Sequence, residues 1–294
     1  MVHRDKVAAN GTLGPTVVSH LLEINVEVTI LTRDPKKSAG HFPTVVRILE
    51  ADYSSPEKLS CLLKGHDSVI ILINRDQVDA QIAAIDAAIA AGVPHIIPSS
   101  FGLDNTIPEV RDSIPIAGKR RMEEYLAHQA EQGKVSFTAL NTSMFLDWAV
   151  AAGVLANPRG LTMVFDGGDK PLSATTLDDI GKAVAKIIQI RDQVRNRFLF
   201  VHSAVVTQNQ LLGYLKELKP DGQFATVQLK TEELEERALR AIEEGTATLR
   251  DIHGLMARVS FGLGHGRFGH VDNELLGIPE HSEEQVKQTV ARFV

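Results

Sequence analysis

The residues with the clearest chemical potential form a glycine-rich turn near the start of the chain. The turn reads Val7-Ala8-Ala9-Asn10-Gly11-Thr12-Leu13-Gly14-Pro15 and precedes a helix with an apolar stripe at Val17–Leu22. A dinucleotide's pyrophosphate needs small residues there, because the backbone must approach the phosphates and the helix must pack against the strand. The helix N-terminus adds free N–H groups and the positive end of its dipole. The pattern predicts a pyrophosphate site, with a plain strand-to-helix turn as the alternative.

A second candidate binding group is the basic segment after the next apolar run. Arg33 is the first residue after Leu31-Thr32, and Lys36 and Lys37 follow closely. An acidic residue at this place would bind the ribose hydroxyls of NAD, whereas an arginine accommodates the 2′-phosphate of NADP. A guanidinium can pair with a phosphate through two hydrogen bonds. The segment therefore predicts NADP over NAD, with a solvated basic turn as the alternative and Asp34 as an acidic neighbour.

Other reactive side chains fit less demanding roles. Ser99 and Ser100 follow a short apolar run but lack the Gly-x-Ser-x-Gly pattern of a nucleophile elbow. We expect them to line a site beside the nicotinamide, past the carboxyl end of a strand. His265 and His270 lie in a glycine-rich segment with no carboxylate or cysteine partner nearby, so we predict a loop and no metal site.

These residues need a scaffold of alternating strands and helices, which the first two thirds of the sequence predicts. Short runs that are apolar on both faces are typical of parallel strands covered on both sides. The predicted strands are Val26–Leu31, Val45–Leu49, Ser68–Ile73, His95–Ile97 and Ser136–Leu140. The predicted helices include one opened by a Ser54/Glu57 capping box, a buried one over Ala80–Ala91 ended by Gly92, and a charged one near Arg111–Gln132. The alternation predicts an α/β fold with a doubly wound (Rossmann) parallel sheet.

After about Trp148 the alternation weakens. The predicted elements there are helices over Leu177–Ile190, Leu211–Leu218 and Thr231–Glu244, a strand over Phe198–Val201 and a loop over Phe261–Phe268. No repeat or flexible linker separates the two halves. We predict an NADP-binding Rossmann domain over residues 1–148 and a smaller α+β substrate-binding region over residues 149–294, partly interwoven with the first.

The composition excludes several classes of protein. The 294 residues are 44% hydrophobic and 23% charged, a balance typical of a globular protein with a sizeable core. A net charge of −6 without a basic stripe argues against nucleic acid as a partner. The single cysteine, Cys61, fits a reducing compartment, and its leucine neighbours predict a buried side chain. The start of the chain lacks a signal-peptide pattern, and Ala80–Val93 is too short for a membrane span, so we expect no membrane partner and a cytoplasmic protein.

Several motifs together resemble the NmrA-like family, closest to its isoflavone reductase and phenylcoumaran benzylic ether reductase branch. The resemblance covers nearly the whole chain, and the overall pattern is that of fungal members. The motifs are Asn10-Gly11-Thr12-Leu13-Gly14, Leu31-Thr32-Arg33, Pro98-Ser99-Ser100-Phe101-Gly102, Lys119, Phe145-Leu146-Asp147-Trp148, Thr176-Leu177-Asp178-Asp179-Ile180-Gly181 and Asp272-Asn273-Glu274-Leu275-Leu276-Gly277.

The resemblance implies an NADPH-dependent reductase of aromatic or polyketide-like small molecules. It implies that Lys119 is the catalytic acid/base. The implied cofactor-binding residues are Ala8, Ala9, Asn10, Gly11, Thr12, Leu13 and Gly14 at the pyrophosphate, Arg33 and the nearby Lys37 at the 2′-phosphate, Asp52 near the adenine, and Met144 and Phe145 with Ser99 on the nicotinamide side.

The residues around Lys119 leave its role open. An exposed lysine on a basic helical face is the simpler interpretation, whereas burial beside a cationic nicotinamide would lower its pKa toward neutral pH and suit proton transfer. The tyrosine–lysine pair of short-chain dehydrogenases is excluded, because no tyrosine has a lysine four residues later. The residues at that spacing are Glu57 after Tyr53, Gln129 after Tyr125 and Leu218 after Tyr214.

Three hypotheses follow. The first is an NADPH-dependent reductase of a conjugated or aromatic small molecule, in secondary metabolism. The second is a redox-neutral isomerase or cyclase on the same fold, motivated by Ala8 in place of the family's first glycine, by the polar first strand, and by Glu123 where the reductases have an arginine. The third is a non-catalytic NADP sensor that binds a protein partner.

Overall fold

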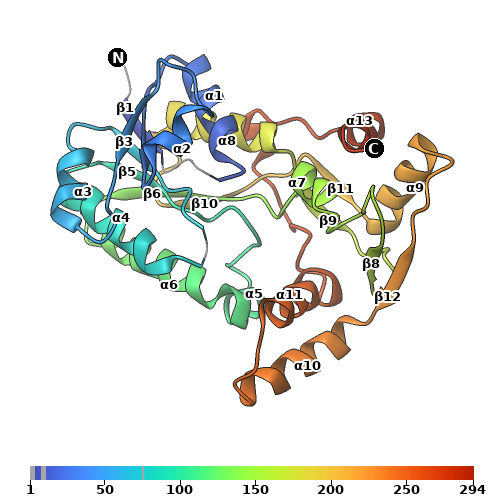
Figure 1. Ribbon diagram of the computed structural model, residues 1–294. Coiled ribbons are helices and arrows are strands. Elements are labelled where there is room, and N and C mark those ends of the chain that lie inside the picture. The colour runs from blue at the N-terminus through green and yellow to red at the C-terminus, as the bar shows by residue number, and fades with distance from the viewer. Residues whose placement is uncertain (1–3, 8–10, 75) are drawn as a thin grey trace.

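A seven-stranded parallel sheet is the largest element of the fold (Figure 1). The computed structural model describes residues 4–7, 11–74 and 76–294, with backbone only for residues 4–7 and 39. In spatial order the strands are β10 (Arg197–Phe200), β6 (Ser136–Asn141), β5 (His95–Ile97), β4 (Ser68–Ile70), β1 (Arg4–Val7), β2 (Glu27–Thr32) and β3 (Arg47–Glu50). Every pairing in this sheet is parallel. The strand order reverses between β1 and β4, which confirms the predicted doubly wound fold and creates a switch point at the carboxyl ends of the strands.

Helices cover both faces of this sheet. One face packs against α1 (Gly14–Glu23) and α8 (Leu177–Gln189), with Val17, Val18 and Leu21 of α1 fully buried. The other face packs against α3 (Pro56–Leu63), α4 (Val78–Ala90) and α6 (Ala117–Glu131). Apolar burial on both faces explains the continuous apolar runs in the strand sequences.

The remaining chain forms two small sheets and several helices. In one sheet β9 (Leu172–Thr175) pairs with β11 (Ala204–Val206) in antiparallel fashion and with β7 (Met144–Phe145) in parallel. In the other, β8 (Thr162–Phe165) pairs in parallel with β12 (Thr226–Leu229). A separate core joins these sheets to α7 (Leu146–Ala151), α9 (Gln208–Leu218) and α13 (Glu283–Ala291).

Shorter elements connect the two parts. Figure 1 shows α10 (Thr231–Glu243) and α11 (Leu249–Ala257) projecting together, with α11 beside α5 (Pro108–Arg111). The others are α2 (Pro35–Ala39), η1 (Ile114–Ile116), η2 (Arg191–Gln193), the π-helical η3 (Arg258–Gly262) and α12 (Asn273–Leu276). Within the described ranges, no helix is both long and apolar enough to cross a membrane.

Two local predictions were wrong, each for a definable reason. The N-cap of α3 is Ser55 and not Ser54, because Pro56 occupies the first helical position and Ser54 instead bonds to Asp52. Cys61 is exposed, because it lies on the face of α3 opposite the buried Leu59 and Leu63.

The charged helix predicted near Arg111–Gln132 is confirmed as α6 but starts later than predicted. The separate elements α5 and η1 precede it, with Pro108 and Pro115 at their starts. A proline is tolerated at the start of a helix but not in its interior. The predicted loop over Phe261–Phe268 also begins within η3.

Candidate active site

The glycine-rich turn leads directly into α1. Ala8, Ala9 and Asn10 lie outside the described residues, while Gly11 and Thr12 are exposed ahead of the buried Leu13 and Gly14. Helix α1 begins at Gly14 without a side-chain cap and without an acidic residue in its first turn. A methyl group on Gly11 would meet no atom of the described residues within 4 Å. The first N–H groups of α1 are suited to an anionic group.

The basic segment lies after β2, the strand beside β1. Arg33 and Lys37 are exposed. Asp34 caps α2, because its carboxylate accepts a hydrogen bond of 3.0 Å from the backbone N–H of Lys37. This bond gives the acidic neighbour of Arg33 a structural role. Burial raises the pKa of Tyr53 to about 12 while Arg33 opposes that shift, so the guanidinium lies near enough to influence the ring.

Asp52 follows β3, the next strand along the same sheet edge. Its Oδ1 accepts hydrogen bonds from the backbone N–H of Ser54 at 2.9 Å and from the Ser54 hydroxyl at 2.5 Å. These bonds, with a smaller contribution from Lys58, hold the pKa of the exposed Asp52 carboxyl below its usual value. Since β1, β2 and β3 are parallel neighbours, Gly11, Arg33 and Asp52 follow the carboxyl ends of adjacent strands.

The predicted nicotinamide-side residues lie past the ends of β5 and β6. The Ser99 hydroxyl donates a hydrogen bond of 3.0 Å to the Ile73 carbonyl. Half-buried Met144 and Phe145 form β7. The backbone N–H of Ser143, just before them, donates to the Gly102 carbonyl at 2.9 Å, so the segments after β5 and β6 lie in contact.

Lys119 lies in the first turn of α6 and is largely buried, in contrast to the simpler interpretation of an exposed basic face. Its side chain is 11% exposed, and its Nζ donates to the backbone carbonyl of Ser100. Burial lowers the pKa of Lys119, while the charges of Glu123 and Asp104 act in the opposite direction. A buried amine with a lowered pKa is the form that a proton-transfer group needs.

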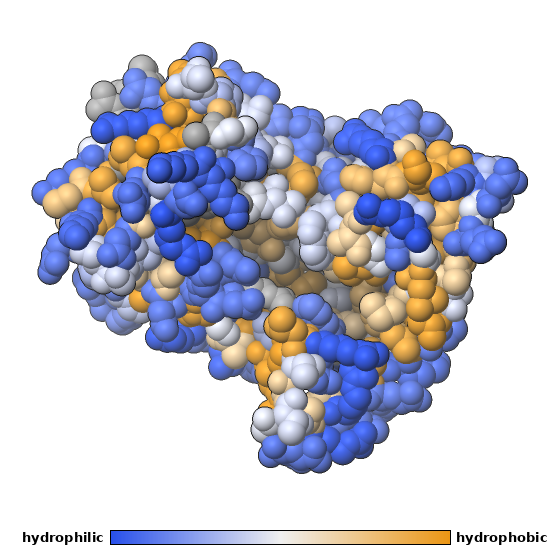
Figure 2. Space-filling view, viewed as in Figure 1, coloured by the Kyte–Doolittle hydropathy of each residue, from blue (hydrophilic) through white to orange (hydrophobic). Residues whose placement is uncertain are grey.

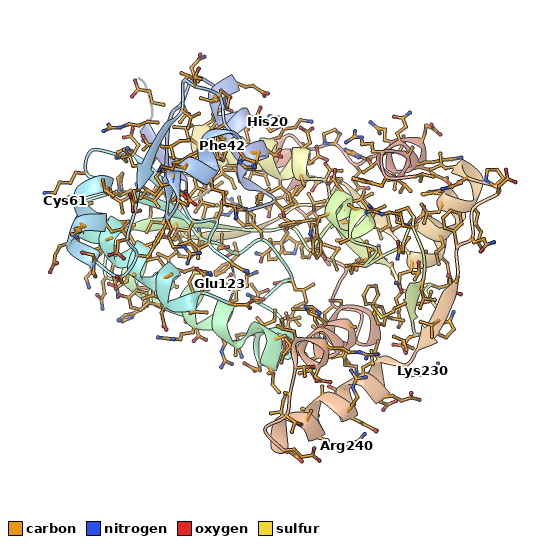
Figure 3. The ribbon with its side chains drawn as sticks, in the orientation of Figure 1. His20, Phe42, Cys61, Glu123, Lys230 and Arg240 are labelled. Carbon is orange, nitrogen blue, oxygen red and sulfur yellow. The ribbon has the colours of Figure 1, made fainter. Side chains whose placement is uncertain are left out.

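A polar cluster surrounds this amine, and the sequence did not predict it. Its members are Ser100, Asp104, Asn105, Lys119 and Glu123, which we call the Lys119 cluster. The carboxylate of Glu123, labelled in Figure 3, accepts hydrogen bonds from the Ser100 hydroxyl at 2.5 Å and from Asn105 Nδ2 at 2.8 Å. Its Oε1 lies 3.9 Å from Lys119 Nζ. The available signal was the i, i+4 spacing of Lys119 and Glu123, which places both on one helix face.

The predicted site residues therefore follow one edge of the sheet. They come after β1, β2, β3, β5 and β6 in turn, all parallel strands of one sheet. Figure 2 shows a hollow in the middle of the molecule in the orientation of Figure 1, between the part with the large sheet and the part with β8 and β9. Within the described part of the chain, no group of three or more histidine, cysteine, aspartate or glutamate side chains could hold a metal ion.

Comparison with known proteins decides the family. The sequence model of the NmrA-like family matches residues 7–218. The chain belongs to the NmrA-like family. It is 32% identical over 212 residues to the oxidoreductase poxI of Penicillium oxalicum, covering 69% of this chain and 66% of that protein, just under two thirds. It is 30% identical to the oxidoreductase aprR of Aspergillus flavus, covering 97% of each chain. Both relatives are named as oxidoreductases.

Solved structures confirm the fold. An isoflavone reductase superimposes with a TM-score of 0.77 at 18% identity, covering 100% of both chains. AtPrR2, solved with NADP+ and (+)-pinoresinol, also gives a TM-score of 0.77 at 16% identity, covering 100% of this chain and 99% of that one. At these identities the likeness describes the fold alone, and the predicted resemblance to the isoflavone reductase branch is confirmed at that level.

Proposed function

We propose that the protein is an NADPH-dependent reductase of an aromatic or conjugated small molecule, active in secondary metabolism. The observation that carries the proposal is the largely buried amine of Lys119 at the carboxyl end of β5, on the sheet edge from which Gly11 leads into α1. Ligands of doubly wound folds bind along this edge. The NADP+ and (+)-pinoresinol of the AtPrR2 structure are a cofactor and a small molecule of the kind that the proposal requires.

The residues present fit NADP(H). The uncapped start of α1 and the turn from Ala8 to Gly14 would bind the pyrophosphate. Arg33 and Lys37 would bind the 2′-phosphate. The carboxylate of the neighbouring Asp34 caps α2 by accepting from the backbone N–H of Lys37. Asp52 would lie near the adenine, and Ser99, Met144 and Phe145 beside the nicotinamide. In this proposal residues 1–148 hold the cofactor, and residues 149–294 shape the substrate pocket.

The chemistry assigned to this chain's own residues is proton transfer. When bound, NADPH supplies a hydride to an electrophilic carbon of the substrate. Lys119, in its ammonium form, gives a proton to the negative charge that develops on the substrate and is left as the neutral amine. The low exposure of this side chain limits competing water, and its lowered pKa eases release of the proton. The proton returns to the amine from solvent after product release.

A redox-neutral isomerase or cyclase is the second candidate, favoured by the carboxylate beside the amine. Lys119 Nζ and Glu123 Oε1 lie 3.9 Å apart, and an amine and a carboxylate at this distance can transfer protons without a hydride. Substrate conversion without a change in nicotinamide absorbance would support this candidate. A non-catalytic NADP sensor would instead keep its function after Lys119→Ala. A small-molecule substrate stays a prediction under the two catalytic candidates, and a cytoplasmic setting under all three.

Calorimetric titration with NADPH, NADH and NADP+ tests the proposal, first on the wild type and then on Arg33→Ala. Hydrogen bonds to a charged group contribute about 1.5–3 kcal/mol, so the variant should bind NADPH roughly 10–150-fold more weakly. NADH binding should be unchanged. Lys36→Ala is the matched control, because it removes an exposed positive charge from the same segment. Absence of binding by every nucleotide would contradict the reductase and the sensor and leave the redox-neutral candidate.

A further inference from the structure

Glu123 has no role in the proposed reduction, yet its carboxylate is the most fully bonded group of the Lys119 cluster. The residue is 6% exposed, and both carboxylate oxygens accept a hydrogen bond from the segment after β5. Ser100 donates to Oε1 and Asn105 donates to Oε2. Since burying an ionised carboxylate is costly without a countercharge, the site needs a cation close by.

Lys119 is the cation that meets this need. Its Nζ lies 3.9 Å from Glu123 Oε1, one helical turn away on α6. Ser100 links the two, because its hydroxyl donates to Glu123 while its backbone carbonyl accepts from Lys119. The amine and the carboxylate are therefore bound to the same residue and cannot move independently without breaking one of these bonds.

Two carboxylates act to raise the pKa of Lys119: Glu123 from its own helix and Asp104 from the segment after β5. The carboxylate of Asp104 already accepts two hydrogen bonds from Thr106, at 2.9 Å from the backbone N–H and 2.6 Å from the hydroxyl. The basic neighbours on α6 are each paired with an aspartate elsewhere, Arg120 with Asp112 and Arg121 with Asp79. Glu123 thus has the direct ionic contact with the amine.

We propose that Glu123 is a positioning residue for Lys119: its carboxylate, fixed by Ser100 and Asn105, holds the amine at the carboxyl end of β5 and keeps it charged until a substrate takes its proton. An arginine at the same position would place a like charge beside the amine. In this chain the lysine therefore has a countercharge, the carboxylate of Glu123, in direct contact. The inference deepens the proposed function and rests on it for the identity of the substrate, but not for its test.

The test is a direct titration of Lys119, which needs neither substrate nor cofactor. Protein grown with lysine labelled at 13Cε is followed by NMR as a function of pH, and the Lys119 signal is assigned by its loss in Lys119→Met. An opposite charge within about 4–6 Å shifts a pKa by about 1–3 units. Glu123→Gln should therefore lower the midpoint of the Lys119 titration by about 1–3 pH units.

The variant is chosen to keep the fold. The substituted amide has the shape of the carboxylate and can still accept from the Ser100 hydroxyl. The Oδ1 of Asn105 is buried and finds no partner among the described residues, so a rotated Asn105 amide can accept from the new N–H. Glu124→Gln is the matched control, because it removes the same charge from the next, exposed residue of the same helix and should leave the midpoint in place.

Each outcome decides the inference. An unchanged midpoint in a folded Glu123→Gln protein would overturn it, since a merely structural glutamate would alter stability and not the titration of Lys119. If Glu123→Gln fails to fold, Glu123→Asp replaces it. The aspartate keeps the charge but withdraws it from the amine, so the midpoint should fall by less than one pH unit, and a rise would overturn the inference. If Glu123→Gln lowers the Lys119 midpoint but the protein binds no nucleotide, the positioning role is supported and the proposed reductase function is contradicted.

Discussion

His95 makes the stability of the fold sensitive to acid. It lies on β5 and is 2% exposed. Its Nδ1 lies 2.9 Å from the Ser136 hydroxyl oxygen, which itself donates to the Pro94 carbonyl at 2.8 Å. Because the Ser136 proton is used in that bond, Nδ1 carries the ring hydrogen and Nε2 is a bare acceptor. Nε2 is buried and has no partner within the described chain. Burial, followed by the charges of Arg191 and Arg195, lowers the pKa of His95 from 6.5 to about 4, against an opposing effect of Asp192.

The magnitude follows from the two pKa values. Between pH 6.5 and pH 4, His95 is protonated in the unfolded chain but neutral in the folded chain. The stability that the neutral ring contributes is therefore fully present above pH 6.5 and is lost as the pH falls toward 4. At 1.36 kcal/mol per unit, a difference of about 2.5 units corresponds to about 3 kcal/mol. Most of this loss, about 2.5 kcal/mol, is reached near pH 4.5.

Urea unfolding of wild type and His95→Asn at pH 7 and near pH 4.5 measures the effect. The asparagine cannot titrate but can still donate to the Ser136 hydroxyl, so the variant should lose about 2.5 kcal/mol less stability on acidification than the wild type. His128→Asn is the control at an exposed position of α6, and on acidification it should lose as much stability as the wild type. Equal losses in wild type and His95→Asn would refute the reasoning.

Three further substitutions test the packing and the chemistry around α6 and α1. Gly118→Ala would place a methyl group 2.7 Å from Val78 Cγ2, so it should destabilise by about 1–3 kcal/mol relative to Gly213→Ala, a helical glycine with nothing within 4 Å, and Val78→Ala should relieve the loss. Gly181→Ala would lie 2.5 Å from His20 Cδ2 where α1 meets α8, and urea unfolding should show a loss of about 1–3 kcal/mol. Lys119→Met should abolish turnover while NADPH binding persists in calorimetry. Because burial lowers the pKa of Lys119, the wild type gains stability as the pH rises toward 10.5, and this variant should not.

The large sheet could be predicted from the sequence because its strands are covered on both faces. Ile70, Ile96 and Ile97 are fully buried, and a run of such residues is readable without knowing its partners. The ends of the strands were less certain, since β4 stops at Ile70 whereas the apolar run continues to Ile73. Residues beyond a strand can stay apolar because they pack beneath loops and helices.

The strands of the small sheets were missed because they are short, whereas helices α8, α9 and α10 and strand β10 were predicted within a few residues of their bounds. β12 is exposed along Thr226–Gln228, and β7 has only two residues. Neither has the alternation that marks a strand. β8, β9 and β11 have three or four residues each, and their pairing joins segments far apart in the chain.

The candidate site also has residues that could be placed from the sequence and others that could not. Residues that follow strand ends, such as Gly11, Arg33 and Ser99, could be placed from local pattern, because parallel strands align their carboxyl ends. The loop partners of the cluster could not be placed, because Ser100 accepts from Lys119 and Asn105 donates to Glu123 across nearly twenty residues of sequence. Glu123 was interpreted as a departure from the reductase pattern, and its hydrogen bonds with Ser100 and Asn105 became visible only when the segment after β5 was packed on α6.

Gly102 shows how closely that packing bears on the chemistry. A methyl group there would lie 3.2 Å from Lys119 Nζ and 3.6 Å from the Ser100 carbonyl oxygen. The end of a lysine side chain can yield by a few tenths of an ångström, so Gly102→Ala should change the free energy of unfolding by less than about 1 kcal/mol. The added methyl group would reduce the remaining exposure of the amine to solvent, and desolvation disfavours its charged form. The titration of Lys119 should therefore move to lower pH. A large loss of stability with an unmoved midpoint would mean that Gly102 shapes the backbone and not the surroundings of the amine.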